Sequence, residues 1–163
     1  MFFGIAVNSF VFVHTLITLV AIASGLVMLF GMLGNRAMPA VHAVFLLFSV
    51  LTAITGFIIQ VTPPTPAVKL GVILSVVLIV ALAARYVFRM AGTWRWIYVV
   101  TAVLSLYLNC FVLVVQAFLK VPALHAIVPA VPPAGPVFGA TQGVVLLFFI
   151  VTGFLAAQRF HPV

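Results

Sequence analysis

Residues 94–119, WRWIYVVTAVLSLYLNCFVLVVQAFL, form an apolar run that decides the fold of this chain. A helix needs about 20 mainly apolar residues to cross the hydrocarbon of a bilayer. Apart from Arg95 near its start, the run carries no charged residue. We therefore predict a transmembrane helix over these residues.

Four further apolar runs flank this segment and have similar lengths. Proline, glycine or basic residues separate them, and the longest connection, 121–136, is rich in proline, which does not continue a regular helix. We predict an all-α fold, an integral membrane bundle of about five transmembrane helices in one domain, 1–163, with a proline-rich outer loop. The predicted helices are 10–33, 40–60, 66–88, 94–119 and 139–158.

The composition independently favours a membrane protein. Apolar residues make up 67% of the chain and charged residues 4%, whereas soluble domains are roughly 45–50% apolar and about 25% charged. The chain has 7 Lys and Arg and no Asp or Glu, which excludes catalysis by paired carboxylates and carboxylate-bound magnesium or calcium. The basic residues are scattered between apolar runs, so we expect no nucleic-acid binding, which requires a basic patch.

The basic residues of the connections predict an orientation. Cytoplasmic connections carry the excess of Lys and Arg. Five basic residues fall on one side of the predicted bundle and two on the other, which places the amino terminus outside and the carboxyl terminus in the cytoplasm. We expect a multi-pass protein of the bacterial inner membrane. The five are Arg36, Arg85, Arg89, Arg95 and Arg159, and the two are Lys69 and Lys120.

Polar residues of the predicted helices share particular faces. At 100° per residue, those of the fourth helix fall within a stripe about 80° wide. An amide facing lipid would lose its hydrogen bonds, so we expect these faces to point inward. They either serve packing alone or form a polar pocket. The predicted polar interior is Tyr98, Thr101, Ser105, Asn109 and Gln116 of the fourth helix, His42, Ser49 and Gln60 of the second, and Gln142 of the fifth.

The histidines are the candidate ligands for a cofactor. His14 and His42 start neighbouring antiparallel helices, so they should lie near opposite membrane faces, and one haem cannot use both. In the outer half, His14, His125 of the outer loop and Gln116 are the candidate binding residues for haem or a quinone. His42 with His161 is the corresponding pair on the inner side. Neither pair has a visible third ligand for a metal ion.

Three functions are compatible with these features. The first is a non-enzymatic accessory or structural subunit of a membrane assembly, whose partners are the lipid bilayer and other membrane subunits or further copies of itself. The second is a haem- or quinone-binding redox component, and the third is a small oligomeric transporter or channel. No nucleophile elbow and no phosphate-binding loop is present in the sequence, so we expect no enzyme.

Several stretches resemble a family of small bacterial polytopic inner-membrane proteins of unassigned activity. They are RWIYVVTAVLSLYLNCFVLVVQAF at 95–118, KVPAL at 120–124 and LTAITGF at 51–57, together with the early His14. The resemblance spans most of the chain and implies a polytopic membrane protein without an established cofactor. Relatives carry an acidic residue in the proline-rich loop, where this chain has PPAGP at 132–136.

Overall fold

The computed structural model describes residues 7–59 and 66–162. It is an all-α bundle, as predicted, and five of its helices are long and apolar enough to cross a membrane. These features indicate a multi-pass membrane protein. The helices are α1 (Val7–Leu33), α2 (Pro39–Ile59), α3 (Pro66–Leu82), which continues into the π-helix η1 (Ala83–Val87), α4 (Thr93–Lys120), the short α5 (Pro122–Ile127) and α6 (Pro136–Arg159).

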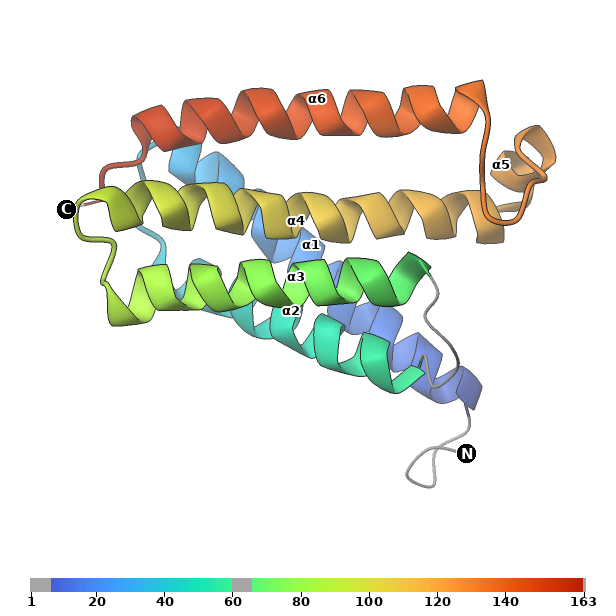
Figure 1. Cartoon of the computed structure of the whole chain (residues 1–163), viewed down its shortest axis with the longest axis horizontal. Helices are drawn as coiled ribbons and strands as arrows, with labels where there is room; N and C mark the ends of the chain where they lie inside the picture. Colours follow the sequence, from blue (N-terminus) through green and yellow to red (C-terminus); the bar gives the residue numbers. More distant parts are fainter. Residues whose placement is uncertain (1–6, 60–65, 163) are drawn as a thin grey trace.

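Helix α4 is the central element of the bundle (Figure 1). It contacts α1, α2, α3 and α6, while α5 contacts α4 alone among the described helices. Figure 1 shows α6 running alongside α4, with α1 crossing obliquely behind them. We call the end that carries Arg36, Arg85, Arg89, Arg95 and Arg159 the arginine end, and the end that carries Lys69 and Lys120 the lysine end.

Local sequence sets the beginnings and ends of these helices. Pro39, Pro66, Pro122 and Pro136 each occupy the first position of a helix, where the missing N–H costs no hydrogen bond and the fixed φ suits the helix. After α1, Asn35 has a φ of 52°, and the amide of the preceding glycine donates to the Phe30 carbonyl over 3.1 Å. The left-handed turn at Asn35 therefore ends α1.

The observed structure differs from the predicted one in four main places. Helix α1 begins at Val7 and α6 at Pro136, each earlier than expected. The last turn of the third span, Ala83–Val87, is a π-helix. Within the loop expected to be irregular, residues 122–127 form α5, because proline at its first position starts a new helix after α4 has ended.

The most closely packed part of the bundle lies towards the arginine end. Gly25 of α1 permits this packing, since a Cβ there would lie 2.5 Å from Leu106 Cδ1 and 2.9 Å from Phe45. Small residues allow such close approach of helices in lipid. The largest fully buried side chains in this half are Tyr98, Phe45, Phe160, Met28, Leu29 and Met32.

Candidate functional site

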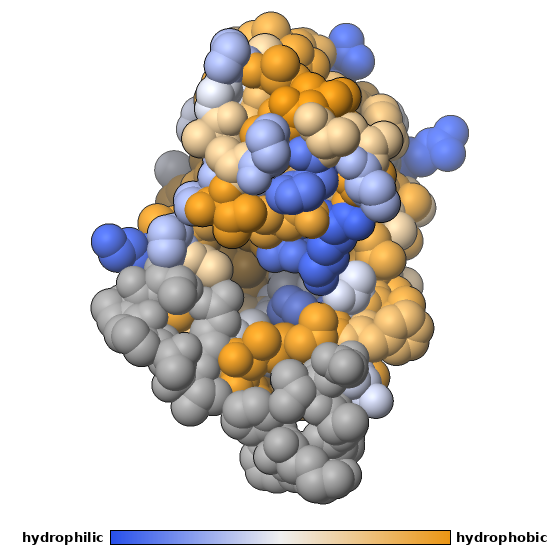
Figure 2. All heavy atoms as spheres, turned by 90° about the vertical axis from the view of Figure 1, so that its right-hand side faces the viewer, coloured by the Kyte–Doolittle hydropathy of each residue, from blue (hydrophilic) through white to orange (hydrophobic). Residues whose placement is uncertain are grey.

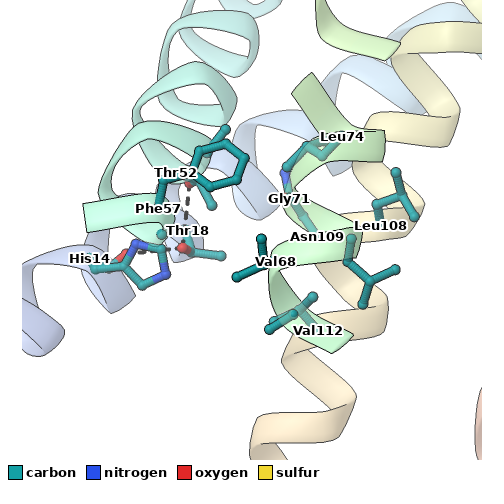
Figure 3. Close-up of a pocket in the computed structure, with 14 residues that line it drawn as sticks. His14, Thr18, Thr52, Phe57, Val68, Gly71, Leu74, Leu108, Asn109 and Val112 are labelled. Carbon is teal, nitrogen blue, oxygen red and sulfur yellow. Dashed lines mark hydrogen bonds between the residues drawn. The ribbon is translucent and has the colours of Figure 1, made fainter. Parts of the chain in front are cut away.

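A pocket of about 100 Å³ lies between four helices in the half of the bundle towards the lysine end. Helices α1 and α2 form one wall and α3 and α4 the other (Figure 3). Figure 2, which faces this end, shows hydrophilic residues gathered near its centre beside a hollow bordered by apolar ones. The polar lining residues are His14, Thr18, Thr52 and Asn109, and the apolar ones include Phe57, Val68, Leu74, Leu108 and Val112.

His14 is held in place by helix α2. Its Nδ1 lies 2.6 Å from Oγ1 of Thr55, and the Thr55 hydroxyl lies 2.7 Å from the Leu51 carbonyl, to which it donates. Since that hydroxyl proton is already used, the Thr55 oxygen accepts from His14, and we assign the imidazole proton to Nδ1. Nε2 is then an acceptor, and it has no hydrogen-bond partner among the residues that the structure describes.

Two threonines complete the wall around His14. The Thr18 hydroxyl donates to the His14 carbonyl over 2.9 Å, and the Thr52 hydroxyl lies 3.4 Å from the Thr18 oxygen. Thr52 also donates to the Phe48 carbonyl over 2.8 Å. Gly56 leaves room for the imidazole, because a Cβ there would meet only His14 Cε1, at 3.6 Å. Backbone bonding of the hydroxyls keeps the threonine side chains fixed.

Asn109 of α4 faces the same pocket from the opposite wall (Figure 3). Its side chain is 2% exposed, and its Nδ2 donates to Ser49 Oγ of α2 over 3.3 Å. No hydrogen bond to its side-chain carbonyl oxygen occurs within residues 7–59 and 66–162. The pocket therefore offers two unpaired acceptors, His14 Nε2 and Asn109 Oδ1, between apolar walls.

Gln142 and Gln116, two glutamines of the predicted polar interior, do not line the pocket of His14. Gln142 of α6 donates through Nε2 to the Phe111 carbonyl of α4 over 3.1 Å, so it fastens α6 to α4. Gln116 is half-buried on α4, two turns beyond Asn109, and does not line the pocket. Gln60 lies outside the described residues. The pocket joins His14 to Asn109 and the two threonines instead.

The structure does not bring the predicted histidine pairs together as ligands. His125 lies on α5, which has no contact with α1, the helix of His14. At the arginine end, the ring of His42 stacks on Phe160, with 5.6 Å between centroids, whereas Nδ1 of His161 lies 3.4 Å from the Arg159 carbonyl. Among the described residues, no group of three or more His, Cys, Asp or Glu comes together.

The remaining predicted interior residues contact other parts of the bundle. His42 Nδ1 lies 2.6 Å from the hydroxyl of Tyr98, and both side chains are at most 1% exposed. Ser105 is fully buried and donates to the Thr101 carbonyl over 2.9 Å. Thr101 is half-buried and donates to the Ile97 carbonyl over 2.7 Å. His42 and Tyr98 therefore join α2 to α4 away from the pocket, whereas Thr101 and Ser105 bond the backbone of their own helix.

Sequence reasoning did not single out Thr52 and Thr55 as members of this site. Thr52 lies three residues after Ser49, about 60° around the helix, so it borders the predicted inward face of α2, whereas Thr55 lies about 120° from Ser49 and off that face. The spacing of Thr52 was the available signal, but hydroxyls that bond their own helix backbone are common in membranes. Only the position of α1 shows that they contact His14 and Thr18.

Comparisons with family models, with curated proteins and with solved structures find no match to this chain. The family resemblance of residues 95–118 and 51–57 therefore stays a prediction.

Proposed function

We propose that this chain is a non-enzymatic accessory subunit of a membrane assembly in the bacterial inner membrane. The proposal rests on the contacts that its inward polar side chains make. His42 contacts Tyr98, Asn109 donates to Ser49, and Gln142 donates to a backbone carbonyl of α4. These groups join helices, as polar side chains do in membrane bundles.

The outer surface of α6 supports association with another helix. Gly139 and Gly143 form a G-x-x-x-G motif, and a Cβ at either position would meet nothing within 4 Å among the described residues. This motif allows close helix–helix contact in membranes, and no other helix of the described residues packs against it. The chain also has a net charge of +7 and no acidic residue, so no acidic side chain of its own pairs with its arginines and lysines.

The test is recovery of the native assembly in mild detergent, followed by mass analysis. We expect the wild-type chain to be recovered with a partner or as an oligomer, and the double variant Gly139→Leu/Gly143→Leu to be recovered alone. Ala140→Leu is the control, because it enlarges an exposed residue that lies about 100° from Gly139 and about 60° from Gly143 around the same helix. A wild-type chain that is monomeric in native membranes would contradict the proposal.

We further propose that the amino terminus faces the outside and that the arginine end faces the cytoplasm. The excess of arginine at one end supports this orientation. A Cys110→Ala background removes the only cysteine, and single cysteines then replace Lys69 or Arg36, both exposed. In intact cells, an impermeant maleimide should label the Lys69→Cys variant and spare Arg36→Cys. Labelling of Arg36→Cys and not of Lys69→Cys would mean that the orientation is the opposite of the one proposed.

A second candidate function is binding of a quinol-type ligand in the pocket. The two unpaired acceptors, His14 Nε2 and Asn109 Oδ1, support it, because they would accept from hydroxyl donors while the apolar walls contain the ring. An oxidised quinone carries only acceptors at these positions, so the reduced form should bind more tightly. We expect His14→Leu to weaken binding of a short-chain quinol and His125→Leu to leave it unchanged, as measured by calorimetry in detergent.

A further inference from the structure

A groove between α4 and α6 is separate from the His14 pocket and has a different chemistry. It encloses about 300 Å³ and is lined by residues of α4 and α6, which run side by side (Figure 1). Its lining is almost wholly apolar. The lining includes Trp96, Val100 and Tyr107 of α4 and Leu146 and Ala157 of α6.

The length of the groove matches one leaflet of a bilayer. On α4 it runs from Trp96 to Tyr107, and on α6 from Leu146 to Ala157. Eleven residues of α-helix rise about 16 Å, and half of the roughly 30 Å hydrocarbon core is about 15 Å. The rings of Tyr107 and Phe149, 5.8 Å apart and edge to face, lie at the inner end of the groove. It therefore extends from the arginine end to about the bilayer centre.

An arginine with free donors lies beside the arginine end of this groove, where it contacts the lining residue Ala157. Nη1 of Arg95 donates to the carbonyls of Ala157, over 3.0 Å, and Phe160, over 2.6 Å. Ala157 itself lines the groove. A guanidinium has five N–H donors, and those on Nε and Nη2 of Arg95 have no hydrogen-bond partner among the described residues. These donors form the edge that binds phosphate in a bidentate manner.

We propose that this groove binds an anionic glycerophospholipid of the leaflet at the arginine end. One acyl chain lies between α4 and α6, and the phosphate accepts from Arg95. Trp96, which is 48% exposed and lines the groove, lies at headgroup level, where tryptophan is enriched. Charge complementarity selects an anionic headgroup, because this end carries five arginines and the chain has no acid to attract a cationic choline.

The proposal can be tested through the fluorescence of Trp96. The chain has two tryptophans, and Trp94→Phe preserves an aromatic ring against Phe88, on which Trp94 stacks at 3.7 Å. This single-tryptophan protein is reconstituted into phosphatidylcholine vesicles that contain a minor fraction of brominated phosphatidylglycerol or, separately, of brominated phosphatidylcholine. A basic residue near the surface contributes about 1 kcal/mol to anionic-lipid binding, so phosphatidylglycerol should quench at about fivefold lower mole fraction.

Matched variants locate the site on the molecule. Arg95→Gln should reduce the preference for phosphatidylglycerol about fivefold. Arg36→Gln makes the same charge change at an exposed arginine of that end and should retain the preference. Val100→Phe fills the groove while leaving Arg95 intact, and it should also remove the preference. This second variant keeps the test valid where Arg95→Gln disturbs folding.

Three results would overturn the proposal. The first is equal quenching of Trp96 by the two brominated lipids. The second is an unchanged preference in both Arg95→Gln and Val100→Phe. The third is the absence of quenching by either lipid, which would mean that another protein surface, such as a second copy of the chain, covers the groove. None of these measurements depends on the partner subunit proposed above.

Discussion

The two ends of this bundle are built from the same five long helices but are packed in opposite ways. At the arginine end, Tyr98 and Phe160 are at most 1% exposed, and Arg95 ties the last residues of α6 to the start of α4. Towards the lysine end, α1 and α2 are separated from α3 and α4 by the pocket of His14 (Figure 3). One end is closed and the other is open.

The size of the facing side chains explains this difference. In lipid, helix association depends on packing and hydrogen bonding, because the surrounding acyl chains are as apolar as the helix surfaces. Large side chains such as Tyr98 and Phe45 fill the space between α2 and α4 at the closed end. At the open end the facing residues include six small ones: Thr18, Thr52, Ala53, Gly56, Ala67 and Gly71. These small residues leave the space that the pocket occupies.

The largest expected effect comes from truncating a side chain at each end. Tyr98→Ala should lower the free energy of unfolding by about 3 kcal/mol, because it leaves a cavity among fully buried side chains. Val112→Ala only enlarges an existing pocket and should cost less than about 1 kcal/mol. Unfolding in mixed micelles of increasing denaturing-detergent content measures both. Equal losses would contradict the contrast between the two ends.

The second expected effect compares the same substitution, glycine to alanine, in the closed half and in the open half of the bundle. Gly25→Ala should destabilise by roughly 1–3 kcal/mol, because its Cβ would lie 2.5 Å from Leu106 Cδ1. Gly56→Ala should be neutral or stabilising by up to about 1 kcal/mol, because the new Cβ makes an ordinary contact with His14 and alanine favours helix. The same unfolding titration compares them. A loss at Gly56 as large as that at Gly25 would refute an open pocket.

Much of the fold could be predicted from the sequence. Apolar length alone gave five spans, and the 100° periodicity placed Tyr98, Ser105 and Asn109 on one face of α4, where the structure buries all three. These predictions succeed because they depend on a single helix in a uniform solvent. They need no knowledge of where neighbouring helices lie.

The features that the sequence did not predict depend on how neighbouring helices are rotated and placed. Gln142 bonds the backbone carbonyl of Phe111, and a backbone acceptor leaves no mark in a pattern of side chains. The partner of His14 proved to be Thr55, not a glutamine or a second histidine, because the rotation of α2 relative to α1 decides which side chains meet. The π-turn at 83–87 likewise lies at the end of an otherwise regular apolar run.

The smallest expected effect concerns two histidines, the buried His42 near the arginine end and the partly buried His14 towards the lysine end. His42→Leu leaves the Tyr98 hydroxyl without its 2.6 Å partner in the closed core and should cost roughly 1–2 kcal/mol. His14→Leu removes a bond at the edge of the open pocket, where water can replace it, and should cost about 0.5 kcal/mol. A double-mutant cycle with Tyr98→Phe isolates the inner bond, with a coupling of about 1 kcal/mol expected. A coupling near zero would mean that shape, and not the His42–Tyr98 hydrogen bond, holds α2 against α4 at the arginine end.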